Sequence, residues 1–258
     1  MTILEPNIIL LIFLFLGGLF AGTVDAIAGG GGLISLPLLI SFGLPPHIAL
    51  GTNKLQASAG TFVATYNYFK NGLISLNVVL KGLLFGFLGA TSGAMAAQFL
   101  DSGILQKLLP FLMVIIFIYS LYIPKLGLHD SHQKMPENIF YILFGFILGF
   151  YDGFLGPAVG SIWVITLVYF LGYNMAKATA YTKLFNLKSN IIAFTCFALG
   201  HNVNYKWGIA MIAGQLIGGK LGSSLVIKKG AQLVRPIFLV VVSITIIVMV
   251  YKSWILRQ

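Results

Sequence analysis

Long apolar runs that recur along the whole chain are the feature that most constrains its fold. They fall at 8–28, 33–43, 47–69, 77–99, 104–122, 138–152, 158–172, 175–199, 206–227 and 233–251. Hydrophobic residues make up 58% of 258 positions and charged residues 9%, against roughly 25% charged in soluble domains. A helix of about 20 apolar residues spans a bilayer. The sequence therefore predicts an all-α membrane protein embedded in the lipid bilayer.

The net charge of +10 comes from basic residues that are spread singly along the chain. A nucleic-acid-binding protein would gather them on one face, so no nucleic acid is expected as a partner. Most are expected at helix ends, where lysine and arginine reach the membrane interface. The one cysteine, Cys196, lies in an apolar run, and no spacing typical of metal ligands occurs. Neither a disulfide, a metal nor a cofactor is predicted.

The first apolar run is expected to remain in the mature protein. Residues 8–21, followed by Ala26, Ile27 and Ala28, have the form of a signal peptide with an A-x-A cleavage site. However, the residues before this run include Glu5 and no lysine or arginine, and a similar stretch recurs at 149–156.

Two short apolar runs each follow a glycine-rich break. The breaks lie at 29–32 and 156–160, and the runs after them cover 33–43 and 158–172. As helices these runs would be about 16–23 Å long, shorter than a hydrocarbon core of about 30 Å. They are therefore predicted to be broken or re-entrant half-helices, which membranes tolerate only inside protein or along a wet cavity.

The two halves of the chain can be aligned with each other. The matched positions are Asp25 with Asp152 at an offset of 127, and Gly43 with Gly172, Ala49 with Ala178, Lys54 with Lys183, Gly89 with Gly218, Gly93 with Gly222 and Tyr122 with Tyr251 at an offset of 129. The sequence thus predicts two homologous four-segment repeats, 1–123 and 138–258, joined by a polar linker at 124–137, with about eight transmembrane helices in all. The lysine and arginine distribution does not decide whether the repeats are parallel or inverted.

The breaks are candidate anion-binding elements. A helix start offers free backbone N–H groups and partial positive charge, and two starts facing one cavity would cradle an anion. Transporters use discontinuous helices in this way. The candidate residues are Gly30, Gly31, Gly32, Pro157 and Gly160. The alternative is close helix packing through small residues, which is the expectation for Gly86, Gly89, Gly93, Gly214, Gly218 and Gly222.

Each half also carries a polar helical stripe that includes a lysine. The stripes are Lys54, Ser58, Thr61 and Thr65 in the first half and Thr179, Lys183, Asn186 and Asn190 in the second. Ionisable groups inside membrane segments are costly and mark a substrate path by default, although lysines can also extend to the interface. The candidate substrate contacts are Asn53, Lys54, Thr61, Lys183, Asn186 and Asn190.

Asp25 and Asp152 each precede a break by about one helical turn. They could cap backbone N–H groups, pair with the lysines, or carry protons as the coupling ion. The sequence leaves these three roles open.

An enzymatic function is not predicted. Tyr151 and Asp152 match one half of the motif of intramembrane aspartyl proteases, but the G-x-G-D element that those enzymes also need is absent. The H-E-x-x-H and G-x-S-x-G motifs are absent as well.

The stretch GGGGLISLPLLISFGLPPHIALGTNKLQ at 29–56, with ATAYTKLFNLKSN at 178–190, resembles the TauE/SafE family of membrane transporters and its YfcA-like branch. The resemblance extends to FYDGFLGPAVGS at 150–161 and GQLIGGKLGS at 214–223. It implies two homologous helical halves, a bacterial cytoplasmic membrane, and export of sulfite or related organosulfur anions. The family usually has glycine where this chain has Ala158, which weakens the expectation of backbone anion contacts there.

These features together predict a secondary transporter for a small anion, such as sulfite or an organosulfonate, bound between repeats that rock against each other. The alternatives are a passive anion channel and a membrane assembly or scaffold protein. Accumulation of substrate against its gradient would exclude the channel. A scaffold would keep its cellular function after Lys54→Gln combined with Lys183→Gln. Substrate, transport direction, coupling ion, membrane orientation and oligomeric state are not specified by the sequence.

Overall fold

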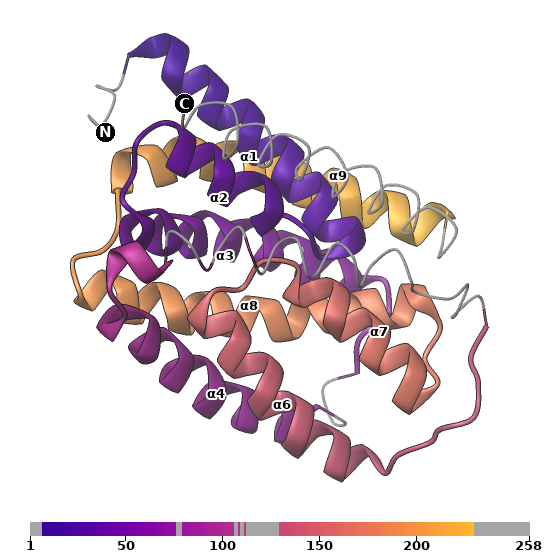
Figure 1. Ribbon diagram of the computed structural model, residues 1–258. Helices are drawn as coiled ribbons and strands as arrows, with labels where there is room; N and C mark the ends of the chain where they lie inside the picture. Colours follow the sequence, from indigo (N-terminus) through magenta and orange to yellow (C-terminus); the bar gives the residue numbers. More distant parts are fainter. Residues whose placement is uncertain (1–6, 76–78, 106–107, 109–110, 112–128, 230–258) are drawn as a thin grey trace.

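The computed structural model describes residues 7–75, 79–105, 108, 111 and 129–229 (Figure 1). Its elements are α1 (Ile8–Ala28), α2 (Gly32–Ser41), α3 (Pro46–Lys70), α4 (Leu80–Phe99), α6 (Glu137–Phe154), α7 (Val159–Leu171), α8 (Met175–Leu199) and α9 (Tyr205–Lys229). The predicted all-α fold is confirmed. The run predicted at 233–251, most of the run at 104–122, and the linker residues 124–128 lie outside the described residues.

The helices begin and end close to the predicted breaks. Gly29 terminates α1 with a φ of 76°, a left-handed conformation that glycine adopts without steric cost. Pro46 occupies the first position of α3, where its missing N–H is not needed. The side chain of Asn174 caps α8 by accepting from the N–H of Lys177. Helix α6 extends to Phe154, two residues beyond the end of the apolar run predicted at 138–152, so Asp152 lies within its last turn.

Three of the described helices, α1, α4 and α9, are long and apolar enough to cross a membrane. Helices α3 and α8 have 25 residues each, about 37 Å of helix, but many of their polar side chains are buried inside the protein. Their polar character follows from this position, because a central helix faces other helices and not lipid.

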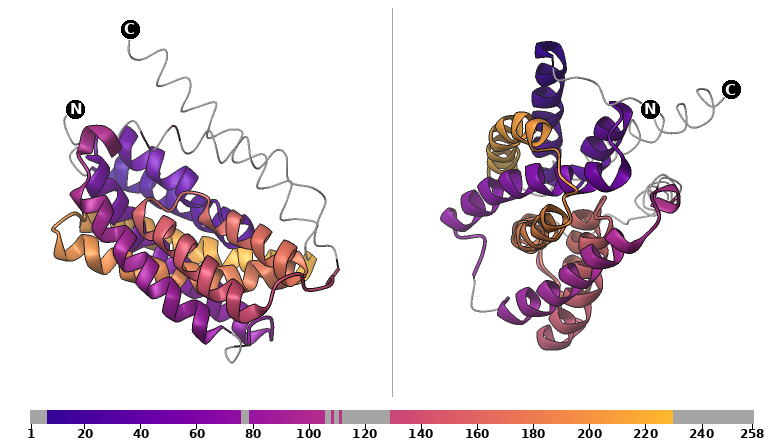
Figure 2. Two further views of the ribbon diagram at one scale, coloured as in Figure 1. Left: turned by 60° about the horizontal axis from the view of Figure 1, so that its bottom comes forward. Right: turned by 90° about the vertical axis from the view of Figure 1, so that its left-hand side faces the viewer.

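The helices form pairs around a central pair. Helix α1 packs along α9, α4 packs along α6, and α3 packs along α8. The right-hand view of Figure 2 shows α1 and α9 on one side of α3 and α8, and α4 and α6 on the other. Helices α3 and α8 therefore form the centre of the protein, between the two outer pairs.

Glycines bring the outer pairs into backbone contact. A Cβ added at Gly214 or Gly218 of α9 would collide with carbonyl oxygens of α1, and one at Gly93 of α4 would collide with α6. Such small residues replace the hydrophobic effect as the basis of helix association in membranes. The predicted packing role is confirmed for Gly86, Gly89, Gly93, Gly214, Gly218 and Gly222.

The described helices form two sets, α1–α4 from the first half of the chain and α6–α9 from the second, and counterpart helices of the two sets run in opposite directions. A Cβ at Gly51, near the start of α3, would lie 2.9 Å from Phe197 at the end of α8. Beyond the other end of α3, the N–H of Ser75 donates to the hydroxyl of Tyr181, near the start of α8 (3.1 Å). Figure 1 lets the reader follow α1, α3 and α9 in one direction and α4, α6 and α8 in the other. This is the arrangement of inverted repeats, although an origin by duplication stays a prediction.

Candidate functional site

The two breaks predicted from the sequence touch each other inside the protein. A Cβ added at Gly29 would lie 2.5 Å from the Cα of Gly160, and one added at Gly160 would lie 2.5 Å from the Cα of Gly29. The hydroxyl of Ser161 donates to the carbonyl oxygen of Ala28 (2.6 Å), which ties the start of α7 to the end of α1. The end of α1 and the start of α7 are therefore joined at the point where the two breaks meet.

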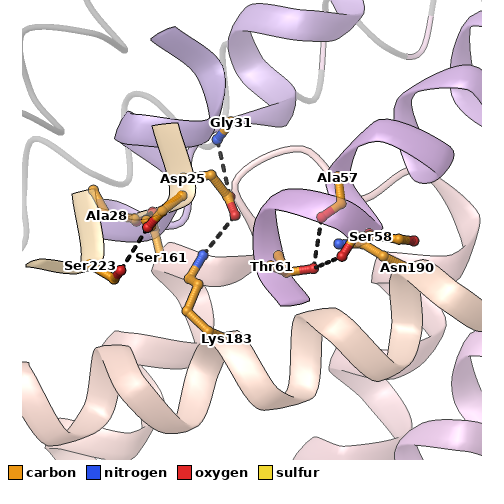
Figure 3. Close-up of polar contacts among 12 residues, drawn as sticks. Asp25, Ala28, Gly31, Ala57, Ser58, Thr61, Ser161, Lys183, Asn190 and Ser223 are labelled. Carbon is orange, nitrogen blue, oxygen red and sulfur yellow. Dashed lines mark hydrogen bonds and ion pairs between the residues drawn. The ribbon is translucent and has the colours of Figure 1, made fainter. Parts of the chain in front are cut away.

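Both lysines of the polar stripes are buried and paired with carboxylates. Nζ of Lys54 lies 2.5 Å from Oδ1 of Asp152, and each side chain is 2% exposed. Nζ of Lys183 lies 2.9 Å from Oδ2 of Asp25, with side chains 0% and 16% exposed (Figure 3). Neither ammonium group reaches the protein surface. Within this structure the lysines do not extend outward, which was the alternative interpretation of their position.

The two ion pairs cross between the helix sets. Lys54 on α3 pairs with Asp152 on α6, and Lys183 on α8 pairs with Asp25 on α1. Each lysine therefore takes its carboxylate from the opposite half of the chain. Because a buried charge is stable only with a partner, each half depends on the other for neutralisation.

The carboxylate of Asp25 lies between a lysine and the start of a helix. One oxygen accepts from Lys183, and the other accepts from the backbone N–H of Gly31 at the start of α2 (3.2 Å; Figure 3). A cation and a helix N-terminus are the two donors that the sequence predicted for an anion. Asp25 thus performs two of its three predicted roles, capping and pairing, while proton transfer remains a prediction.

Asp152 is held differently. Its Oδ1 accepts from Lys54, whereas its Oδ2 is buried without a hydrogen-bond partner among the described residues. Lys54 also donates to Oδ1 of Asn190 on α8 (3.2 Å). The position of Asn190 at the ion pair agrees with its predicted place on the lysine face of α8.

Asn186 lies at the contact between the breaks. A Cβ added at Gly160 would be 2.9 Å from Nδ2 of Asn186, and Oδ1 of Asn186 has no hydrogen-bond partner among the described residues. A buried amide oxygen without a partner is a position where a ligand or water would be stabilised.

The other break residues have structural contacts. A Cβ added at Gly32 would lie 3.5 Å from the Cα of Pro157, so these predicted site residues face each other across the two breaks. The carbonyl oxygen of Pro157 accepts from the hydroxyl of Tyr151 (2.9 Å). The carbonyl oxygen of Gly30 accepts from the N–H of Leu33 and closes the first turn of α2.

Thr61 and Asn53 are buried but already satisfied by protein groups. The hydroxyl of Thr61 donates to the carbonyl oxygens of Ala57 and Ser58 in its own helix (Figure 3). Oδ1 of Asn53 accepts from the side chains of Ser35 and Gln56 and so fastens α2 to α3. The structure therefore places neither side chain oxygen in contact with an ion pair.

Sequence reasoning missed Ser35 and Ser161, which hold the two half-helices in place. Ser35 donates to Asn53 on α3, and Ser161 donates to Ala28 at the end of α1. A signal was present, because each is a polar residue in the first turn of a mostly apolar half-helix. Within the described residues no group of three or more histidine, cysteine or acidic side chains could hold a metal ion.

Comparisons with known proteins show the family of this chain. The family model described as Sulfite exporter TauE/SafE matches residues 14–249. The chain belongs to the TauE/SafE family. It is 41% identical over 252 residues to a Haemophilus influenzae protein named probable membrane transporter protein, covering 97% of this chain and 99% of the relative. It is 40% identical over 245 residues to the probable membrane transporter protein YfcA of Escherichia coli K12, covering 95% and 91%. No solved structure matches.

Membership of the TauE/SafE family makes the protein a membrane transporter and not an enzyme. Ala158, where the family resemblance led us to expect glycine, adopts a φ of 56° just before α7. A side chain in this left-handed region costs roughly 1–2 kcal/mol. The backbone at this break thus has the conformation that glycine favours, although the residue in this chain is alanine.

Proposed function

We propose that the protein is a secondary transporter of a small anion, either sulfite or an organosulfonate, which binds at the Asp25–Lys183 pair. The supporting observation is that Lys183 and the N–H of Gly31 already hold a carboxylate between them. An oxyanion of sulfur would use the same charged and backbone donors. The amide nitrogen of Asn186, which lies beside Gly160, supplies a further hydrogen-bond donor at the breaks.

The Asp25 pair is the better binding position of the two because it is less enclosed. The side chain of Asp25 is 16% exposed, whereas those of Asp152 and Lys54 are each 2% exposed. An anion can approach Lys183 and displace the carboxylate of Asp25, which otherwise keeps the empty site neutral. The Lys54–Asp152 pair then serves to hold the two helix sets together.

The helix arrangement supports alternating access. Opposed helix sets that meet at broken helices near a central site are the plan of many secondary transporters, in which one set rocks against the other. Both ion pairs cross between the sets, so exchanging a carboxylate for substrate changes the contacts that join them. We expect a multi-pass protein of the bacterial cytoplasmic membrane that exports its substrate, with protons as the coupling ion.

A binding experiment tests the site directly. Purified protein is melted with sulfite, sulfate, thiosulfate, taurine, sulfoacetate or methanesulfonate at millimolar concentration. An anion present at about 100 times its Kd should stabilise the protein by about 2.7 kcal/mol and raise Tm by about 5–11 °C. Lys183→Met should lose this shift, while Lys206→Met, an exposed lysine at the start of α9, should keep it. No shift with any of these anions would contradict the proposal.

A transport experiment separates the transporter from its alternatives. In proteoliposomes with an imposed proton gradient, we expect the stabilising anion to accumulate above its external concentration. Flux that only equalises the two concentrations would indicate a channel. Absence of flux, with cellular function retained in the Lys54→Gln, Lys183→Gln double variant, would indicate a scaffold.

A further inference from the structure

A third lysine lies in the middle of α8 and has no place in the site described so far. Lys188 is 13 residues from the first residue of α8 and 11 from the last, or about 20 Å and 16 Å along the helix. Its four-carbon stem is much shorter than either distance. Lys188 therefore cannot extend its ammonium group to an interface at the ends of the helix.

The ammonium group of Lys188 is buried against α4. A Cβ added at Gly86 would collide with it, so the absence of a side chain at Gly86 makes room for this group. Nζ of Lys188 has no exposed surface and no hydrogen-bond partner among the described residues. The one ionisable residue on α4 is Lys81, which is exposed and donates to Asn138.

Asp152 links Lys188 to the site. It lies on α6, which packs against both α4 and α8, the helix that Lys188 contacts and the helix that carries Lys188, and its carboxylate is bonded to Lys54. Its second carboxylate oxygen has no partner among the described residues. A change of charge at the ion pairs therefore changes the electrostatic potential at Lys188, because the interior has a low dielectric constant.

The charges of this buried group do not balance. Lys54, Lys183 and Lys188 carry three positive charges when protonated, while Asp25 and Asp152 carry two negative charges. An excess charge in the interior is costly unless it is compensated or removed. Either Lys188 releases its proton, or an anion with a single negative charge enters.

We propose that Lys188 is the proton carrier of the transporter, neutral when the site is empty and protonated when an anion is bound. This rests on the proposed function, because the anion is the one that binds at the Asp25–Lys183 pair. A proton from bulk water adds to the lone pair of the Lys188 amine as the anion binds, and both leave together. Each cycle then moves one proton with one monoanion, such as bisulfite or a sulfonate, and carries no net charge.

Proton uptake on binding tests this proposal. Methanesulfonate is a suitable probe because it keeps a single negative charge throughout the pH range used. Calorimetric titration in buffers of different ionisation enthalpy gives the number of protons taken up per anion, between about pH 6 and pH 9. We expect the wild-type protein to take up about one proton per anion at pH values where the empty site holds a neutral lysine.

Variants at Lys188 identify the group that takes up the proton. Lys188→Met should bind the probe more weakly and take up no proton. Lys188→Arg, whose guanidinium stays protonated, should bind methanesulfonate without taking up a proton. This variant replaces Lys188→Met in the test if the methionine variant does not fold. Lys206→Met should behave as wild type.

The outcomes separate this inference from the proposed function. Binding to the wild-type protein without proton uptake at any pH, or uptake that persists in Lys188→Met, would overturn the role of Lys188 alone. Failure of the wild-type protein to bind methanesulfonate or any other anion of the panel would overturn the proposed function, and the inference with it.

Discussion

The Lys54–Asp152 pair should be a strong determinant of stability, and Asp152→Asn tests this. The two side chains are each 2% exposed and their charged atoms are 2.5 Å apart. Removing one member of a buried ion pair leaves an uncompensated charge and costs about 3–5 kcal/mol. Of its two partners among the described residues, Lys54 would keep Asn190, a neutral acceptor at 3.2 Å.

The expected loss can be measured by thermal unfolding of the purified protein in detergent. For a protein of this size, 3–5 kcal/mol corresponds to a decrease in Tm of roughly 6–20 °C. Replacing both members, Lys54→Met with Asp152→Leu, should recover most of this loss, because an apolar pair of similar volume is often as stable as a buried ion pair.

Lys81→Met is the matched control, since Lys81 is exposed and bonded to Asn138. It should change stability by no more than about 0.5 kcal/mol. A Tm of Asp152→Asn close to that of the wild type would refute the reasoning. So would a double variant no more stable than the single one, because the charge left behind would then not be the cause.

Two further predictions concern the breaks. Gly160→Ala should destabilise the protein by about 1–3 kcal/mol, because its Cβ would lie 2.5 Å from the backbone of Gly29. Gly32→Ala is its control, since that Cβ would make an ordinary contact at 3.5 Å; equal Tm values for the two variants would contradict the break-to-break contact. Ala158→Gly removes the steric cost of an alanine in the left-handed region, roughly 1–2 kcal/mol. The more flexible unfolded chain of the glycine variant offsets about 0.4–1 kcal/mol of this gain. Its Tm should equal or exceed that of the wild type, and a clear decrease would count against strain at this position.

The breaks and the half-helices could be predicted from local sequence. Glycine tolerates the left-handed turn at Gly29, and Pro46 fits only the first turn of α3, so these residues mark helix ends without any tertiary information. The apolar runs that follow the two breaks are too short to span a bilayer, so they predicted short helices between long ones. Local chemistry was sufficient for this part of the fold.

The partners of the lysines could not be predicted in the same way. The spacing from Asp25 to Lys54 resembles that from Asp152 to Lys183, so pairing within or between the halves was equally compatible with the sequence. Tertiary packing selects the crossed arrangement. Thr61 was predicted to contact substrate from helical periodicity alone, but a threonine can donate to the carbonyl oxygens of its own helix.

Lys188 could not be predicted from positions that match between the two halves. An offset of 129 aligns Lys188 with Ala59, so it has no counterpart in the first half. A residue that breaks the repeat is invisible to a comparison of the two halves. Its burial and its missing partner became apparent only from the packing of α8 against α4.

The affinity of Asp25→Asn for sulfite, measured by calorimetry, tests the central claim most directly. If the carboxylate of Asp25 occupies the place of the substrate, its removal frees Lys183 and the N–H of Gly31. We predict binding at least about tenfold tighter than in the wild type, or about 1.4 kcal/mol, and no binding in Lys183→Met. Affinity that is unchanged or weaker in folded Asp25→Asn would contradict the account, because the carboxylate would then not compete with the anion.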